Sequence, residues 1–230
     1  MGYSLSWLAV EAALAPAVVD RFGLSATGET SEHAADFKVS TARLPGWYLL
    51  VWESDFLIDS TLLKELSAQG RVVAVFVEEH VMFSSAEEWK NGERLWGAAH
   101  VTEVDLLHIG VTGELPASYA SIHREEMDLQ KQAGGRKAGV DHIFEIPVRL
   151  GEEVVGYRHD SAGDEFHEMN MARQPRSRPV HLLIDGVSAI TGALDKSASA
   201  WYRENKATRP EDKPAGPTKP GFFGRLFGKG

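Results

Sequence analysis

The strongest strand signal in the chain is RVVAVFVEEHVMF, residues 71–83. Side chains in a β-strand point to alternate faces, so apolar residues at every second position mark a strand with one buried face. Such a face is formed here by Val73, Val75, Val77, Val81 and Phe83. We therefore predict one long strand over 71–83, interrupted on its apolar face only by Glu79.

The sequence before this strand alternates between strand and helix signals. A half-buried strand is predicted over 3–10, a helix over 16–22 ending at Gly23, and a polar loop over 27–36. Pro45-Gly46 fits a type II turn, which predicts a hairpin between 37–44 and 47–53. Asp59 or Ser60 is the expected N-cap of a helix over 61–69, which Gly70 ends.

A second hairpin is predicted directly after the long strand. Asn91-Gly92 is the dipeptide that best fits a type I′ turn, and it lies between 85–90 and 93–101. A loop of this length would place Trp89 and Trp96 on the same face as diagonal neighbours. The alternative is a short helix from Ser84, because SSAEE satisfies a capping box. We favour the hairpin.

The second half of the chain is less regular. We predict a helix over 117–133, a third hairpin formed by 143–150 and 153–159, and an irregular polar segment over 161–179. Apolar residues then recur at helical spacing from 180 to 205, which predicts an amphipathic helix.

The order of elements predicts the fold class. The first 80 residues are expected to form β-α-β-β-α-β, the ferredoxin-like arrangement. We therefore predict an α+β protein with a mainly antiparallel sheet, extended by hairpins and closed by a C-terminal helix. Residues 1–205 would form a single domain, with an alternative division near 110–116. A disordered, proline-rich linker is expected over 206–219, followed by a basic aromatic tail over 220–230.

Composition and charge exclude several classes of function. The 230 residues include no cysteine, which excludes disulfides, a thiol nucleophile and any zinc site with a cysteine ligand. The net charge of −9 argues against nucleic acid as a partner. That charge is unevenly divided: residues 203–230 carry seven Lys/Arg and three Asp/Glu, a net +4, which leaves −13 for residues 1–202. An acidic body with a basic tail favours a protein partner, especially a basic one.

The sequence also predicts a cytoplasmic location without stable membrane insertion. The apolar N-terminal stretch has no basic residue before Arg21, which argues against a secretory signal. No stretch reaches the roughly 18 uncharged residues that are needed to span a bilayer.

Candidate catalytic residues occur in two places. Glu79 on a valine-rich face would have a raised pKa, as a general acid requires, and His80 beside it could accept the proton. His100, Asp105 and His108 form a second group, which the helical residues 123–126 could approach. Together they define the alternative function, a hydrolase with a His/Asp/Glu centre. The simpler interpretation is that these side chains meet solvent or form ordinary ion pairs.

Candidate ligand sites are weaker. Residues 158–168 contain His159, Asp160 and His167, whose nitrogen and oxygen donors could bind a divalent metal, but their spacing matches no metal motif. A solvated turn is the favoured interpretation. Residues 133–139 combine glycines with two basic residues, yet they lack the Walker pattern and fit a helix end better. We expect no cofactor.

The preferred function is a non-enzymatic protein-binding module of the inhibitor, immunity or adaptor type. Tryptophans are enriched at binding hot spots, so Trp89 and Trp96 are candidates for an exposed acidic sheet surface. The tail tip is the second candidate, because a disordered segment has no folding reason to keep its apolar residues. Its candidate contacts are Phe222, Phe223, Arg225, Leu226 and Phe227. The oligomeric state is not predicted.

Overall fold

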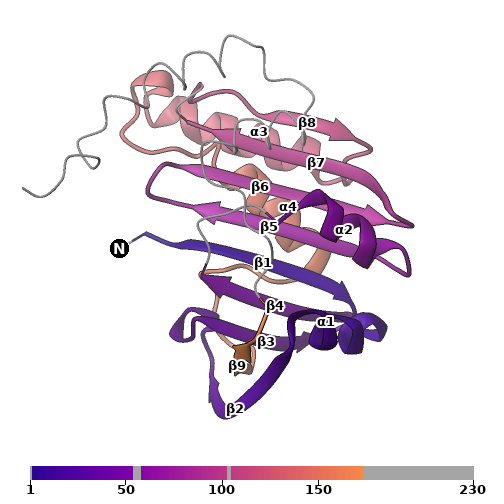
Figure 1. Cartoon of the computed structure of the whole chain (residues 1–230). Helices are drawn as coiled ribbons and strands as arrows, with labels where there is room; N and C mark the ends of the chain where they lie inside the picture. The colour runs from indigo at the N-terminus through magenta and orange to yellow at the C-terminus, as the bar shows by residue number, and fades with distance from the viewer. Residues whose placement is uncertain (1, 54–57, 103–104, 174–230) are drawn as a thin grey trace, which may run out of the picture.

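An antiparallel sheet contains every strand of the described residues, which are 2–53, 58–102 and 105–173 of a computed structural model. Its strand order is β2-β9-β3-β4-β1-β5-β6-β7-β8 (Figure 1). The strands are β1 (Ser4–Glu11), β2 (Leu24–Ser31), β3 (Val39–Leu44), β4 (Trp47–Glu53), β5 (Val72–Glu78), β6 (Phe83–Lys90), β7 (Glu93–Val101), β8 (Gly110–Gly113) and β9 (Phe166–Met171). The α+β fold class with a large antiparallel sheet is thereby confirmed.

Helices cover both faces of this sheet (Figure 1). The first face, here called the α2 face, packs against α1 (Ala15–Phe22) and α2 (Ser60–Ser67). The opposite α4 face packs against α4 (Glu145–Val155), which in turn contacts α3 (Tyr119–Gln132). Short 3-10 turns occur at η1 (Ala12–Leu14), η2 (Ala34–Asp36) and η3 (Gly135–Lys137). Alternate side chains of the central strands therefore enter two separate hydrophobic cores.

Local signals in the sequence correctly predict several element ends. The Asp59 side chain accepts a hydrogen bond of 2.7 Å from the backbone N–H of Thr61 and caps α2. Gly23 adopts the left-handed conformation with φ +60°, which ends α1. Gly46, with φ +83°, occupies the third position of the turn between β3 and β4.

The prediction of one strand over 71–83 is wrong. β5 ends at Glu78, and a turn that includes Met82 at φ +49° leads into β6. The Glu78 carboxylate stabilises this turn by accepting the backbone N–H of His80 at 3.0 Å. Phe83 pairs with Glu78 and so points to the opposite face from Val77. The apolar alternation happens to continue through this turn. Alternation alone does not indicate where a strand ends and the chain reverses.

The ferredoxin-like start is not confirmed. Residues 27–36 were expected to form a loop, but most of this segment belongs to the edge strand β2 and to η2. β2 has almost no buried side chains, so it lacks the apolar alternation that marks a strand. In addition, β1 pairs antiparallel with both β4 and β5, whereas a βαβ unit places parallel strands side by side.

The third predicted hairpin is a helix. Residues 143–150 and 153–159 mostly belong to α4, which ends at Gly156 with φ +80°. Ile143, Ile146 and Leu150 are buried at spacings of three and four residues, which is helical periodicity. Gly151, assigned to a turn by the sequence, instead lies against the sheet. The irregular segment over 161–179 likewise contains β9, which joins β2 to β3.

The predicted helix over 180–205, the linker over 206–219 and the tail over 220–230 lie outside the described residues. The alternative domain boundary at 110–116 falls on β8, which pairs with β7 in the same sheet. Among the described helices, none has the length and apolar character needed to cross a membrane.

Candidate functional site

The five candidate catalytic residues lie near one end of the sheet, where β5 and β7 end and β6 begins. They form two separate groups there. Glu79 and His80 follow β5 in the turn to β6, whereas His100 is the next-to-last residue of β7, and Asp105 and His108 follow that strand. No hydrogen bond or ion pair found among the described residues joins one group to the other.

The first group is held by short structural contacts. One oxygen of Glu79 accepts the backbone N–H of Tyr3 at 3.0 Å, and the other lies 3.4 Å from Nε2 of His159. His80 Nδ1 contacts Glu78 at 2.7 Å. Glu79 is not on the valine face, because the strand ends before it, and its side chain is 29% exposed. The Tyr3–Glu79 hydrogen bond thus links the start of β1 to the turn after β5.

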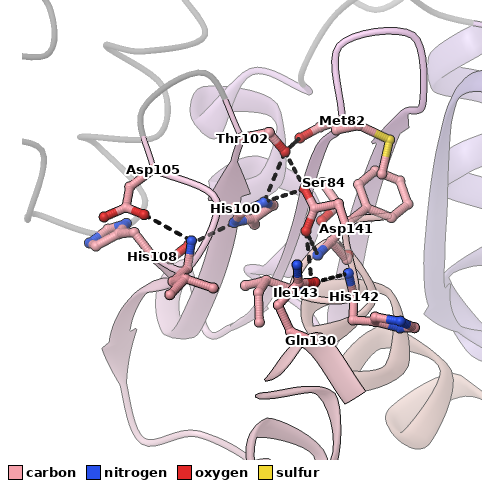
Figure 2. Close-up of polar contacts among 12 residues, drawn as sticks. Met82, Ser84, His100, Thr102, Asp105, His108, Gln130, Asp141, His142 and Ile143 are labelled. Atoms are coloured by element: carbon pink, nitrogen blue, oxygen red, sulfur yellow. Dashed lines mark hydrogen bonds and ion pairs between the residues drawn. The ribbon is translucent and has the colours of Figure 1, made fainter. Parts of the chain in front are cut away.

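The second group centres on the buried ring of His100 (Figure 2). Its Nδ1 lies 2.6 Å from the carbonyl oxygen of His108. Its Nε2 lies 2.8 Å from a carboxylate oxygen of Asp141 and 3.1 Å from the hydroxyl of Thr102. The Thr102 hydroxyl also donates to Asp141. The ring is therefore in contact with acceptors on both sides.

Asp141 links this network to the start of α4. Its second carboxylate oxygen accepts the backbone N–H groups of Ile143 at 3.0 Å and Phe144 at 3.2 Å (Figure 2). Burial raises the pKa of Asp141, but the hydrogen bond and positive charge of His100, with the Thr102 hydroxyl, outweigh it and leave the pKa lowered. Asp141 thus orders the loop before α4 through an ionised carboxylate.

The network has the geometry of a structural ion pair. A carbonyl oxygen can only accept, so Nδ1 of His100 donates to His108, while Nε2 lies within hydrogen-bond distance of the Asp141 carboxylate and the Thr102 hydroxyl. Because both ring nitrogens have protein partners and the side chain is fully buried, neither nitrogen is placed to take a proton from a substrate as a general base. Sequence reasoning missed Asp141, although an aspartate before an apolar helical run is an N-terminal helix signal.

The remaining members of the second group have other partners. Asp105 pairs with Arg136 from the 133–139 loop, and this hydrogen bond lowers the pKa of Asp105. His108 contributes its backbone carbonyl to the His100 ring. In the 123–126 segment, Glu126 pairs with Arg149 of α4 rather than with His100. The predicted His/Asp/Glu centre therefore does not converge around His100.

The candidate metal ligands are also dispersed. His159 contacts Glu79, Asp160 pairs with Arg158 at 2.6 Å, and His167 lies on β9. Among the described ranges, no group of three or more histidine, aspartate or glutamate residues has metal-binding geometry.

The two candidate tryptophans are buried on opposite faces of the sheet. Trp89 belongs to the core of the α2 face and Trp96 to that of the α4 face. The hairpin over Asn91-Gly92 forms as predicted, but a β-bulge pairs Trp89 with Arg94 and Glu88 with Trp96. The extra residue reverses the alternation, so the prediction of a shared face is wrong. Both side chains are buried among the described residues, so neither forms an exposed contact surface for a partner.

A hollow of about 250 Å³ opens at the same end of the sheet, beside the start of β1, the end of β4 and η2. It is lined by Gly2, Tyr3, Ser4, Leu5, Ala34, Ala35, Phe37, Val51, Trp52 and Glu53. Sequence reasoning gave no indication of this hollow, because its walls come from three segments that are distant along the chain.

The chemistry of the hollow is aromatic and acidic. Tyr3 and Phe37 are partly buried in its wall, and Glu53 is its one charged lining residue among those described. Glu79 lies next to it, because a Cβ on Gly2 would be 3.2 Å from Cβ of Glu79. An apolar recess with carboxylates nearby suits a segment that combines an aromatic or aliphatic side chain with a cation.

Comparison with known proteins provides no relative: no protein-family model, curated protein or solved structure matches this chain.

Proposed function

We propose that this protein is a non-enzymatic binding module, of the inhibitor, immunity or adaptor type, whose hollow holds a basic segment of a protein partner. The observation that carries the proposal is the combination of aromatic wall and carboxylate in one hollow, formed by Tyr3, Phe37 and Glu53. In this proposal the hollow replaces the buried Trp89 and Trp96 as the binding surface.

Charge supports the choice of a basic partner. The net charge of −13 over residues 1–202 attracts cationic segments at long range, which raises the association rate and discriminates against acidic partners. At the hollow, Glu53 is exposed, so a lysine or arginine of the partner can reach its carboxylate from solvent, and the partly exposed Glu79 adds negative charge nearby. The partner's apolar side chain would then enter the recess.

The polar groups at this end of the sheet support binding over hydrolysis. A hydrolase needs a base with a free lone pair close to its acid or nucleophile. Both ring nitrogens of the buried His100 are engaged by protein groups, and Glu79 holds the backbone of Tyr3. The proposal includes a cytoplasmic location, no cofactor and no nucleic-acid partner. The C-terminal helix over 180–205 and the tail tip over 220–230 remain predicted elements of it.

A matched pair of charge variants tests the proposal. Affinity purification with quantitative mass spectrometry would compare the full-length protein with Glu53→Lys and Glu93→Lys. Glu93 is also an exposed glutamate, but it lies at the β6–β7 hairpin, away from the hollow. We expect a basic partner that is captured by the wild type and by Glu93→Lys, and at least tenfold less by Glu53→Lys.

Direct binding of that partner, once purified, completes the test. Its affinity should fall steeply between about 0.05 and 0.2 M salt, because screening weakens exposed charge pairs. Equal binding to both variants, or binding that is indifferent to salt, would show that the hollow is not the contact.

A further inference from the structure

We infer that the basic aromatic tail tip of this chain, residues 221–229, occupies the hollow when no partner is bound and competes with it. The inference rests on the proposed function, since it describes regulation of the same site. It commits to an intramolecular occupant, in which one phenylalanine ring enters the recess beside Tyr3 and Phe37 and Arg225 approaches Glu53.

Complementary chemistry is the first argument. The hollow is mainly apolar with a carboxylate in its lining, and the tip GFFGRLFGK combines large apolar residues with two cations and no acid. In a solvated state, the apolar side chains of the tip bury nothing. Within residues 203–230 the tip is the only part with large apolar side chains. Docking in the hollow would bury these side chains and bring the cations of the tip close to a carboxylate.

Reach is the second argument. The described chain ends at Arg173, whose side chain donates to the carbonyl of Asp20 at 2.7 Å, so its last described residue lies beside α1. The predicted linker over 206–219 can extend on the order of 45 Å. The tip begins 48 positions beyond Arg173. A domain of this size has a radius of gyration of about 15 Å, so this length of chain is sufficient to reach the hollow.

Tethering makes even a weak contact effective. A disordered linker, as predicted over 206–219, would give the tip a local concentration on the order of 1 mM. A tip that binds the hollow with a dissociation constant of about 100 µM would then occupy it roughly nine-tenths of the time. A partner competing for the hollow would bind the wild-type chain about tenfold more weakly than a chain with a disabled tip.

The absence of cysteine allows a clean crosslinking test in the full-length protein. One double variant carries Ala35→Cys with Gly224→Cys, which places one thiol at the exposed edge of the hollow and the other within the tip. The control carries Ser25→Cys with Gly224→Cys. Ser25 is exposed on β2, near the end of the described chain, but outside the hollow.

Mild oxidation followed by intact-mass and peptide analysis measures how fast the intramolecular disulfide forms. We expect the Ala35→Cys pair to close at least tenfold faster than the Ser25→Cys pair. Adding Glu53→Lys should slow the Ala35→Cys pair several-fold, and a synthetic peptide of residues 220–230 at about 1 mM should slow it roughly twofold, because the peptide then equals the local concentration of the tip. Equal closure rates in the two pairs, or a rate that neither the peptide nor Glu53→Lys changes, would overturn the inference.

The failure of this inference can be distinguished from failure of the proposed function, because crosslinking requires no partner. If both cysteine pairs close at the same rate while Glu53→Lys still captures less partner, the tail inference is wrong and the proposed binding function is retained. If the Ala35→Cys pair closes faster as expected while Glu53→Lys leaves partner capture unchanged, the hollow binds the tail and the proposed partner contact is wrong.

Discussion

The pKa values of two buried carboxylates, Asp141 and Glu87, are set by the groups that surround them. Asp141 is paired with His100 and bound to backbone N–H groups, and these contacts lower its pKa. Glu87 is buried on β6 beside Trp89, whose indole N–H donates to it at 2.8 Å. Burial dominates there and raises the pKa of Glu87 to about 7, although Trp89 and Arg94 oppose the shift. One carboxylate therefore stabilises the fold when charged and the other when protonated.

The first prediction concerns Asp141→Asn. It removes the carboxylate that pairs with the fully buried His100 ring, which costs about 3–5 kcal/mol of unfolding free energy. In a double-mutant cycle with His100→Asn, the combined cost should be at least about 1 kcal/mol less than the sum. Asp128→Asn, which breaks an exposed pair with Lys131, serves as control and should cost less than about 1 kcal/mol. Urea unfolding measures all four variants.

An Asp141→Asn variant as stable as Asp128→Asn would show that the network is not a buried ion pair. The pH dependence gives a further check, because a lowered folded-state pKa means that Asp141 stabilises the protein at neutral pH. That contribution should disappear as the pH falls through the carboxylate range, and only when Asp141 is present.

The second prediction concerns pH and Glu87→Gln. Because the folded-state pKa of about 7 lies above the ordinary value of 4.5, Glu87 adds stability below about pH 4.5 that is lost as the pH rises through 7. Glu87→Gln keeps an acceptor for the Trp89 indole without the buried charge. It should raise the unfolding free energy at pH 8 by on the order of 3 kcal/mol and change it little at pH 4.5.

Glu93→Gln, at an exposed position on the same hairpin, is the control and should leave both values within about 0.5 kcal/mol. Thermal unfolding at the two pH values is sufficient. A stabilisation by Glu87→Gln that is equal at pH 4.5 and pH 8 would mean that removal of a buried charge is not its cause.

At the scale of elements, helix α4 depends on a close approach to the sheet. A Cβ on Gly151 would lie 2.6 Å from Cγ2 of Val75 and 3.0 Å from Cζ2 of Trp7. Both neighbours belong to the core of the α4 face, where neither side chain has room to move. Glycine is therefore required mid-helix, where it would otherwise be unfavourable.

The third prediction is that Gly151→Ala destabilises the protein by about 1–3 kcal/mol through overpacking. This is opposite in sign to the gain of about 1 kcal/mol that helix propensity alone would give. Glu153→Ala, on the exposed side of α4, should stay within about 0.5 kcal/mol of the wild type. A stabilising Gly151→Ala in chemical unfolding would contradict the described packing of α4 on β1 and β5.

At the scale of the whole molecule, stability should decrease from the centre of the sheet to its edges. β1 lies between β4 and β5, with buried side chains on both faces, whereas β2 and β8 are the edge strands of the described sheet. Edge strands have hydrogen-bonded neighbours on one side only and open at lower free energy.

The fourth prediction is therefore a gradient in hydrogen exchange. Amides in 7–10 and 73–77 should exchange slowest, close to the rate set by global unfolding, and those in 25–30 of β2 should exchange orders of magnitude faster. Mass spectrometry of exchanged peptides resolves these segments. Protection of 25–30 equal to that of 73–77 would show that this edge is covered.

The predictability of the elements follows from how locally each is encoded. Asp59, Pro45-Gly46 and Asn91-Gly92 act through their own backbone preferences, so the α2 cap and two hairpins were correctly predicted. The end of β5 at Glu78 and the edge strand β2 were missed, because neither interrupts nor creates an apolar pattern. Helix α4 was missed because Gly151 resembles a turn residue until its neighbours on the sheet are known.

The candidate site was predictable only as a set of residue types. The sequence correctly marked His100 as a residue of interest. Its partner Asp141 lies 41 positions later in the sequence, after helix α3. The bulge that separates Trp89 from Trp96 adds one residue to β7, and no local signal marks it. The hollow joins the start of β1, η2 and the end of β4, so none of these segments contains it alone.

The fold class, the turns at Pro45-Gly46 and Asn91-Gly92, the α2 cap, the absence of thiol chemistry and the division into an acidic body and a basic tail could all be predicted from the sequence. These properties depend on composition or on a few contiguous residues, whose conformational preferences act before any long-range contact forms. The strand order, the opposite faces of Trp89 and Trp96, the His100–Asp141 pair and the hollow became visible only in the folded structure. These arise when distant segments close on one another, and the energy that selects them resides in packing and burial rather than in local preference.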